Sequence, residues 1–381
     1  MDLELTEAQR GARDTARRFA RDKLDAWGVE TDRTHRFPAE AIAELGKLGM
    51  LGVFVPEQYG GAGLDNVTYA LVIEELAVAC ASTAVIVSAH SSLATWPILG
   101  LGTEADRTRY MPKMATGEWI GCFALTEPQA GSDAAGQKTR AVREGDSYVI
   151  NGTKNFITNG PEAAVAIVFA MTAPEHGNHG ISAFIVETSS PGWQVVRVED
   201  KMGIHGSHSA QITLSDLRVP RENLLMGEGE GFKVAMKTLD GGRIGIAAQA
   251  VGIGRAAVEA SLKYAHERQT FGRPLASNQA IQWKLADMAM EIDAARLLTL
   301  RAAAVKDAGQ PCTKQSAIAK LFAAEAAMKA ATEAVQIHGG YGYTKEFKVE
   351  RYFRDAKITE IYEGTSEVQR LVIASQVLQN R

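Results

Sequence analysis

The sequence predicts an α+β protein in three parts: an N-terminal helical domain, a middle β-barrel or β-sandwich domain, and a C-terminal helical bundle. The spacing of apolar residues supports this prediction. Their period is that of a helix up to about residue 117, is two residues from about 119 to 220, and is that of a helix again from about 229. The length of 381 residues accommodates two or three domains with cores of their own. We place the domains at residues 1–118, 119–226 and 227–381.

The first domain is predicted to start with a helix, because Thr6 and Gln9 form a capping box before a run of apolar residues at helical spacing. A second helix is predicted to open at Pro38, as a first-turn proline, and to end near Gly49. Residues 55–63 read as a loop, and further helices are predicted at 67–81 and about 104–115.

The middle domain is predicted from segments that alternate with a period of two and are rich in β-branched residues. Strands are expected at residues 148–150, 165–170, 181–186, 194–198 and 211–214. Asn151-Gly152 is a strong turn signal, and we place a turn there between two strands.

The last domain is predicted to consist of long helices. Residues 231–267 contain almost no helix breaker except glycine, and residues 279–308 and 312–337 are rich in alanine. Helices of this length without internal stops usually pack along one another in a bundle.

Composition excludes several classes of protein. With 46% hydrophobic and 23% charged residues the chain has the composition of a globular protein, and its net charge of −4 argues against nucleic-acid binding. Cys80, Cys122 and Cys312 match no zinc or redox spacing, so we expect no metal and read them as reduced packing residues. The longest apolar run, 163–171, is shorter than the ~20 residues of a membrane helix. The acidic start is not a signal or transit peptide, and we expect no membrane association.

The most informative segment is residues 361–370, Ile-Tyr-Glu-Gly-Thr-Ser-Glu-Val-Gln-Arg. Glu363 stands between bulky apolar residues and Gly364, and we expect Ser366 and Gln369 to form a capping box at the start of the last helix. A carboxylate on a tight turn before a helix is rigid and partly dry, as a general base for a carbon acid must be. The plain alternative is an ordinary turn glutamate.

Three further segments accompany it: Cys122-Phe-Ala-Leu-Thr-Glu-Pro-Gln-Ala-Gly-Ser-Asp133, Arg268-Gln-Thr-Phe-Gly-Arg-Pro274 and Gln336-Ile-His-Gly-Gly-Tyr-Gly-Tyr343. In this order and spacing, the four segments resemble the acyl-CoA dehydrogenase family of flavoproteins, from Leu5 to about Gln379. Within the family, the chain looks most like the short-chain (butyryl-CoA-type) members. The resemblance implies the same α–β–α order of domains, with a four-helix bundle at the C-terminus.

The resemblance implies FAD as the cofactor. It assigns the flavin to a loop and a strand of the middle domain, with residues Phe123, Leu125, Thr126, Gly131, Ser132, Phe156, Ile157 and Thr158. Many relatives carry Trp in place of Phe156. Taken alone, the loop could be a capped turn and the aromatic a core residue.

A second set of cofactor residues is implied to come from a neighbouring subunit or from the segment after the base: Arg268, Phe271, Gln279, Gln336, Gly339, Gly340, Thr365 and Glu367. The arginine suits a pyrophosphate, which it can bind bidentately, although an arginine at a helix C-terminus also interacts favourably with the helix dipole. The glycine-rich loop 339–342 lacks the strand–turn–helix context of a nicotinamide-binding motif. The resemblance therefore implies FAD and not NAD, and this assignment depends on the coincidence of the motifs.

The substrate residues implied by the resemblance are Ser132, Asp240, Arg243, Gln249, Thr359, Tyr362 and Gly364. Two glycines inside a helix cost about 1 kcal/mol each relative to alanine, so something should approach closely at Gly241-Gly242, either a ligand or a neighbouring helix. Gln249 and Thr359 are implied to close the far end of the acyl pocket, which favours a short straight chain. The alternative is that both are merely packed and the pocket is deeper.

The implied reaction is α,β-dehydrogenation of a short-chain acyl-CoA to the trans-2-enoyl-CoA. Glu363 takes the α-proton, the β-hydrogen leaves as hydride to flavin N5, and an electron-transfer flavoprotein accepts the electrons. The family's usual assembly is a homotetramer, a dimer of dimers. We expect a cytoplasmic location in a bacterium, or the mitochondrial matrix for a mature eukaryotic form.

Several alternatives remain. An acyl-CoA oxidase would use the same base, and branched-chain or cyclic-chain acyl-CoA dehydrogenases would differ in the pocket. Some branched-chain and long-chain members carry the base on the helix that holds Asp240, but Gly241, Gly242 and Arg243 leave no carboxylate there. A flavin monooxygenase of the same fold would need no carboxylate at 363. A DNA-associated relative of the fold would be expected to have a basic extension, and none is present.

Overall fold

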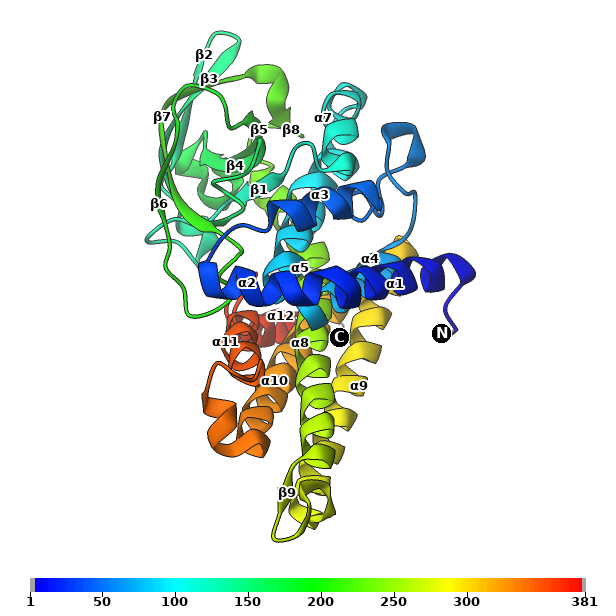
Figure 1. The fold of residues 1–381 in the computed structure, drawn as a ribbon. Helices are drawn as coiled ribbons and strands as arrows, with labels where there is room; N and C mark the ends of the chain where they lie inside the picture. The colour runs from blue at the N-terminus through cyan, green and yellow to red at the C-terminus, as the bar shows by residue number, and fades with distance from the viewer. Residues whose placement is uncertain (1–3, 379–381) are drawn as a thin grey trace.

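The computed structural model describes residues 4–378, which form two helical regions with a sheet region beside them (Figure 1). The N-terminal region contains helices α1 (Glu7–Phe19), α2 (Asp25–Thr34), α3 (Ala39–Lys47), α4 (Asn66–Ala79), α5 (Ala81–Ser88), α6 (Trp96–Leu101) and α7 (Glu104–Thr116). Two π-helical segments, Ala20–Leu24 and Ala89–Thr95, connect α1 to α2 and α5 to α6.

The predicted capping box of α1 is confirmed. The Thr6 hydroxyl accepts a hydrogen bond from the Gln9 N–H at 3.2 Å, and the Gln9 Oε1 accepts one from the Thr6 N–H at 2.9 Å. The second helix begins one residue later than predicted, because Pro38 is the capping residue before α3.

The helical stretch Ala81–Leu101 was not predicted. It is buried on nearly every side, so its sequence lacks the one-sided periodicity by which an amphipathic helix is recognised. By length and composition it is the one stretch of residues 4–378 that could cross a membrane, but 78% of its apolar window is buried inside the protein, as in a core helix.

The sheet region contains strands β1 (Gly121–Ala124), β2 (Arg140–Glu144), β3 (Ser147–Thr158), β4 (Val165–Met171), β5 (Ile181–Glu187), β6 (Trp193–Val198), β7 (Ser209–Pro220) and β8 (Leu224–Leu225). Their order is β6-β7-β3-β2-β4-β5-β8, and β1 pairs in parallel with β4. All five predicted strands are confirmed. The central strand β4 is buried on both faces: Val165, Ile167 and Phe169 pack toward the helices, whereas Ala166 and Val168 pack inside the sheet layers.

The predicted turn at Asn151-Gly152 is wrong. Both residues lie inside β3, where a register shift relative to β7 marks a bulge. The physical reason is a close approach: a Cβ at position 152 would lie 2.3 Å from the Thr139 hydroxyl, so the glycine makes room for a neighbouring segment. The turn between β2 and β3 instead contains Gly145, with φ +62°.

The C-terminal region contains α8 (Gly231–Glu267), α9 (Gln279–Asp307), α10 (Thr313–His338), α11 (Val349–Thr359) and α12 (Ser366–Leu378). A short hairpin of β9 (Gln269–Thr270) and β10 (Arg273–Pro274) separates α8 from α9. The three long helices match their predicted ranges closely. They run together away from the sheet region and carry the hairpin at their far end (Figure 1). The buried face of α10 consists mostly of alanine, which lets the bundle helices pack closely.

Candidate active site

Glu363 lies on the turn between α11 and α12, and its backbone is left-handed. Its φ is +53° and that of Gly364 is +95°. Gln369 holds this turn, because its Nε2 donates hydrogen bonds to the carbonyl of Glu363 at 3.2 Å and to that of Gly364 at 2.8 Å. A Cβ at position 364 would lie 2.6 Å from the same Nε2, so glycine is required there.

The predicted capping box of Ser366 and Gln369 is therefore wrong. Ser366 is the first residue of α12 and its buried hydroxyl finds no partner within residues 4–378. The Thr365 hydroxyl accepts from the Val368 N–H at 3.3 Å and caps the helix instead. Gln369 does not complete a capping box because the Ser366 N–H donates instead to the Glu360 carbonyl at 2.9 Å, which leaves the Gln369 Oε1 without a donor among the described residues.

Glu363 is half-buried, and one of its two carboxylate oxygens, Oε2, is fully buried. No hydrogen-bond donor among the described residues reaches its Oε2 atom. Burial raises the pKa of Glu363 to about 7, against the opposing charges of Lys320 and Arg243. A carboxyl group with a pKa near 7 is matched to proton abstraction at neutral pH.

Glycines on α8 make room for this site. A Cβ at Gly242 would lie 2.0 Å from the Glu363 Oε2 and 2.7 Å from Leu93. One turn later, a Cβ at Gly245 would lie 2.3 Å from both the Tyr69 and the Ser88 hydroxyl oxygens. The close approach that the glycines predict is confirmed, and at Gly242 the approaching group is the carboxylate of Glu363.

Asp240 and Arg243 form an ion pair at the N-terminal side of this stretch, with 2.8 Å between Nη1 and Oδ1. The second Asp240 oxygen accepts from the Thr313 hydroxyl at 2.6 Å, and burial raises the pKa of Asp240. The guanidinium of Arg243 is 5% exposed, and its Nε is buried without an acceptor among the residues that the structure describes. An unused donor beside Glu363 is available to a polar ligand.

Gln249 and Tyr362 close the other end of the same stretch. The amide of Gln249 donates to the Ala81 carbonyl at 2.9 Å and accepts a hydrogen bond from the Tyr362 hydroxyl. Thr359 is fully buried and donates to the Ala356 carbonyl at 2.7 Å. Gly242 and Gln249 lie seven residues apart on one face of α8, which corresponds to about 10 Å along the axis.

The loop after β1 is held by a buried ion pair. Lys154, which is fully buried, donates to Glu127 at 2.8 Å, to the Leu125 carbonyl at 3.1 Å and to Gln137 at 3.1 Å. Glu127 also accepts from the backbone N–H groups of Lys138 and Thr139. This pair fixes the segment that carries Leu125, Thr126, Gly131 and Ser132.

Phe156 faces solvent beside this loop. Its side chain is 62% exposed and its φ is +56°, whereas Ile157 is buried and Thr158 is half-buried. The Asn155 N–H donates to the Thr126 carbonyl at 2.8 Å, so loop and strand form one surface. Phe123 packs edge-on against Phe169. An aromatic side chain that protrudes from a positive-φ backbone position is suited to cover a planar ligand.

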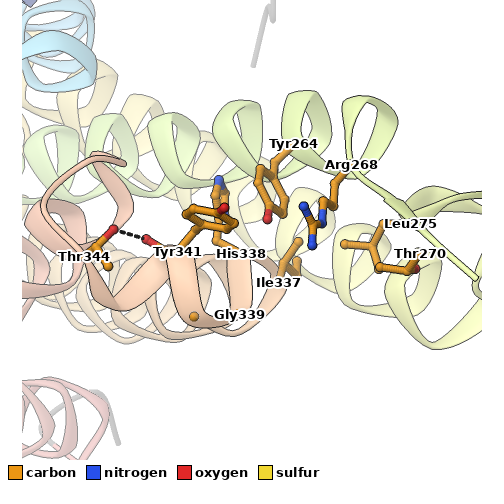
Figure 2. A pocket seen from close by; sticks show the side chains of 10 residues that line it. Tyr264, Arg268, Thr270, Leu275, Ile337, His338, Gly339, Tyr341 and Thr344 are labelled. Carbon is orange, nitrogen blue, oxygen red and sulfur yellow. Dashed lines mark hydrogen bonds between the residues drawn. The ribbon is translucent and has the colours of Figure 1, made fainter.

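A cavity of about 470 Å³ lies at the far end of the bundle, away from Glu363 (Figure 2). It is lined by Tyr264, Arg268, Thr270, Leu275, Ile337, His338, Gly339, Gly340, Tyr341 and Thr344. The guanidinium of Arg268 lies over the Tyr341 ring, 5.8 Å from its centre, and His338 stacks on Tyr264. Gln336 precedes this loop, and Gln279 opens α9 nearby.

The tip of the β9–β10 hairpin adds an exposed aromatic to this end. Phe271 is fully solvent-exposed, and it and Gly272 both have positive φ, as in a tight hairpin turn. Arg268 and Phe271 belong to the β9 end of the bundle, whereas Phe156 in β3 and the loop after β1 belong to the sheet region (Figure 1). Within one chain, the predicted cofactor residues at the hairpin end are therefore apart from those of the sheet region.

The chain matches three family models along its length. They are the N-terminal domain of acyl-CoA dehydrogenase over residues 6–118, its middle domain over 122–217 and its C-terminal domain over 229–378. The chain belongs to the acyl-CoA dehydrogenase family. The comparison leaves the exact domain boundaries at 118/119 and 226/227 as predictions.

Among its relatives is the mitochondrial short-chain specific acyl-CoA dehydrogenase of Mus musculus, 50% identical over 378 residues, 99% of this chain and 92% of that protein. Butyryl-CoA dehydrogenase from Megasphaera elsdenii is a solved structure with a TM-score of 0.98 and 48% identity over 99% and 100% of the two chains. A structure described as the electron transferring flavoprotein of Acidaminococcus fermentans gives a TM-score of 0.98 and 49% identity over 100% of both chains. A more distant one, glutaryl-CoA dehydrogenase from Mycobacterium smegmatis in complex with FADH2, gives 0.93 and 33% over 99% and 96%.

The sequence analysis did not predict two buried lysines that contact the candidate sites of this acyl-CoA dehydrogenase family member. Lys154 and Lys320 are both fully buried, and each binds a carbonyl next to a predicted site residue. A signal for Lys320 was present, because it interrupts a stripe of buried alanines at helical spacing on α10. Lys154 has no such signal, since it lies on a strand whose partners come from a loop.

Proposed function

We propose that this protein is an FAD-dependent acyl-CoA dehydrogenase that converts a short-chain acyl-CoA to the trans-2-enoyl-CoA, with Glu363 as the base. The carboxylate of Glu363 carries the proposal. Its Oε2 atom is buried and unpartnered within the described chain, the pKa of the carboxyl group is near 7, and the Oε2 faces Gly242 of α8, where a Cβ would lie 2.0 Å away. A chain of this family with that arrangement has a base ready for a carbon acid.

Flavin is the cofactor of this family, and its dinucleotide form fits two features of the structure. In the sheet region, Thr126, Ser132, Thr158 and the exposed ring of Phe156 offer hydroxyls and a flat apolar cover. At the far end of the bundle, Arg268 faces a cavity beside Gly339 and Gly340, where a Cβ would meet open space. Backbone N–H groups of such glycines can approach a pyrophosphate. Thr365 and Glu367 remain proposed cofactor residues after the base.

When bound, the flavin supplies the acceptor for the hydride that leaves the β-carbon. The protein's part is proton transfer and orientation. Glu363 takes the α-proton onto its free oxygen, and the electron pair left behind forms the new double bond as the hydride departs. An acyl chain that expels water from the site raises the basicity of this carboxylate further. We infer that Asp240, Arg243 and Ser132 orient the thioester and the pantetheine. We also infer that the backbone N–H of Glu363 donates a hydrogen bond to the thioester oxygen, and that Gly364 lies next to the thioester.

A short straight acyl chain is the proposed substrate. Gln249 lies about two turns beyond Gly242 on α8 and accepts from the Tyr362 hydroxyl, and the hydroxyl of Thr359 is likewise satisfied internally, by the Ala356 carbonyl. A longer chain would gain about 0.8 kcal/mol per buried CH₂ group, but it would have to displace these bonds. The measurement is kcat/KM for straight acyl-CoAs of increasing length, with isovaleryl- and glutaryl-CoA as branched and dicarboxylic probes. An optimum at octanoyl-CoA or longer, or with either probe, would contradict the chain-length assignment only.

The reaction is tested by flavin bleaching with acyl-CoA in the absence of oxygen, in wild type and in Glu363→Gln. The wild type should bleach and the variant should stay yellow, with a rate lower by about 10²–10⁴-fold. A near-wild-type rate in the variant would refute the base. Electrons are proposed to pass to an electron-transferring flavoprotein, and an oxygen electrode separates this activity from that of an oxidase.

We further infer that the flavin is shared between two copies of the chain in a homotetramer. This would bring Arg268 and the fully exposed Phe271 of one copy to the flavin site of another, which a single chain cannot do. A monomer that retains its full flavin in solution, measured by light scattering, would refute this. Location in a bacterial cytoplasm or a mitochondrial matrix stays a prediction that cell fractionation tests.

A further inference from the structure

Lys320 is a buried cation next to the catalytic turn. It lies in the middle of the alanine face of α10 and has no exposed surface. Its Nζ donates a hydrogen bond of 2.7 Å to the carbonyl oxygen of Gly364, 44 residues later in the chain. A lysine is rarely buried completely unless it is paired, so this contact needs an explanation.

The Gly364 carbonyl is the point at which the turn is held. It accepts from the Lys320 Nζ and, at 2.8 Å, from the Gln369 Nε2. Together these two donors restrain a turn in which Glu363 has a left-handed backbone, a conformation that a residue with a side chain adopts only when its surroundings enforce it. The ammonium therefore helps to direct the Glu363 carboxylate toward Gly242.

The charge of Lys320 also acts on that carboxylate. Lys320 and Arg243 are the two cations that lower the pKa of Glu363 against burial, and Lys320 is the larger influence. Arg243 is already paired with Asp240, whereas Lys320 makes its hydrogen bond to a neutral carbonyl. The ionisable groups around the pair are Arg243 on α8, Tyr69 on α4, Tyr362 on the same turn, and Glu360 and Glu367 on either side of it.

We propose that Lys320 is a positioning residue for the base: it fixes the turn that aims Glu363 and, by its charge, increases the ionised fraction of that carboxylate at neutral pH. The inference rests on the proposed function, in which Glu363 takes the α-proton. Burial lowers the pKa of Lys320 to about 8, so the ammonium is charged in the same pH range in which Glu363, with a pKa near 7, must be ionised.

Three variants separate the two roles. Lys320→Met removes the donor and the charge, Lys320→Gln keeps a donor without the charge, and Lys320→Arg keeps both. Lys329→Met, on the same helix but half-exposed and paired with Glu291, is the matched control. The rate of anaerobic flavin reduction by butyryl-CoA is measured from pH 5.5 to 9.5 in each.

Loss of the charge should move the acidic limb of the rate profile to higher pH by about one unit, the lower end of the effect of a nearby opposite charge. The ionised fraction of Glu363 at pH 7 then falls from about a half to about a tenth. Flavin reduction at pH 7 should therefore be about five-fold slower, and its rate should recover near pH 9. Lys320→Gln should show this shift with a nearly normal plateau, and Lys320→Met should also lose plateau rate. Lys320→Arg and the control should keep the wild-type limb.

An acidic limb unmoved in Lys320→Gln and Lys320→Met would overturn the electrostatic role, and unchanged plateaus in every variant would overturn the role in aiming the base. A second readout needs no turnover: the pH at which the stability advantage of Glu363→Gln over its parent levels off should rise by the same unit in a Lys320→Gln background, because this limit is set by the pKa of Glu363 in the folded protein. If Lys320→Met fails to fold, the Gln and Arg variants carry the test. A fully active Glu363→Gln would instead remove the proposed function itself.

Discussion

Replacing Glu363, the proposed base, should make the protein more stable, and only at a pH where its carboxylate is ionised. Glu363→Gln keeps the shape of the buried side chain and removes its charge. In the folded protein the pKa of Glu363 is about 7, against 4.5 for an ordinary glutamate, because burial disfavours the carboxylate. The folded state therefore holds this proton more tightly than the unfolded chain, and wild-type stability falls as the pH rises from about 4.5 to about 7.

The size of the effect follows from the shift. A shift of 2.5 units, at about 1.36 kcal/mol each, gives an upper bound of about 3 kcal/mol, and partial solvent contact of Glu363 reduces this to about 1–3 kcal/mol. With an unfolding entropy of about 2.1 cal/mol/K per residue over 381 residues, Tm should rise by about 1–4 °C.

The assay is thermal and urea unfolding of flavin-loaded wild type and Glu363→Gln at pH 5.0 and pH 8.5. The variant should be the more stable protein at pH 8.5 and nearly equal to wild type at pH 5.0. Glu118→Gln, a surface change at a 61%-exposed side chain, should alter neither value appreciably. Equal shifts at both pH values, or a loss of stability at pH 8.5, would refute the argument that burial strains the ionised carboxylate.

Three further predictions follow from other contacts. Gly242→Ala should slow flavin reduction by about 100-fold, because its Cβ would displace the Glu363 carboxylate; Gly11→Ala, in open space on α1, should instead stabilise by about 0.5–1 kcal/mol. Lys154→Met should cost about 3–5 kcal/mol in urea unfolding by leaving Glu127 buried and unpaired, and a near-neutral result would contradict the buried ion pair. Arg268→Ala should lose flavin on gel filtration and lower Tm, whereas Arg273→Ala, on the same hairpin, should retain it; equal retention by both would count against Arg268 as a flavin ligand.

Sequence reasoning succeeded where the decisive pattern is local. The limits of α8 were predicted because residues 231–267 contain almost no helix breaker except glycine. The turn at Glu363 was predicted because a glutamate, a glycine and a helix start follow one another in the sequence. The helices from Ala81 to Leu101 were missed because burial on all sides erases periodicity. Likewise, Gln369 was read as part of a cap, since no local pattern reveals that its amide reaches back to two carbonyls of the turn.

The position of the base in three dimensions depends on residues that no motif contains. Gly242 was expected to meet something, but only the fold identifies that group as a carboxylate 121 positions away. Lys320 interrupts the alanine stripe of α10, but its role could not be predicted because its partner is a backbone carbonyl, which has no sequence signature. Motifs thus identify the reacting groups, whereas their aim and their pKa are tertiary properties.

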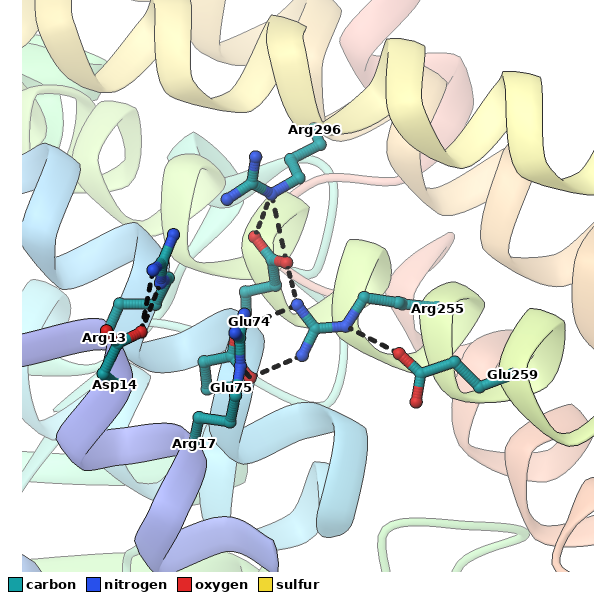
Figure 3. A network of polar contacts seen from close by, with 8 residues as sticks. All are labelled: Arg13, Asp14, Arg17, Glu74, Glu75, Arg255, Glu259 and Arg296. Atoms are coloured by element: carbon teal, nitrogen blue, oxygen red, sulfur yellow. Dashed lines mark hydrogen bonds and ion pairs between the residues drawn. The ribbon is translucent and has the colours of Figure 1, made fainter. Parts of the chain in front are cut away.

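A buried ionic network explains how two domains hold one active site. Glu74 and Glu75 on α4 are 3% and 2% exposed, and they bind arginines from three other helices (Figure 3). Arg255 of α8 contacts both carboxylates, Arg296 of α9 lies 2.8 Å from Glu74, and Arg17 of α1 lies 2.8 Å from Glu75.

Such a network adds little net stability, because each ion must be desolvated, but it specifies the register of the helices. If α4 slid by one turn along α8, both carboxylates would be left buried without arginines. That register is also what sets the Tyr69 and Ser88 hydroxyls against Gly245 and Leu93 beside Gly242. The proposed acyl site lies between an N-terminal helix pair and α8, so we expect its width to depend on these ion pairs, which lie more than one turn beyond the residues proposed to touch the substrate.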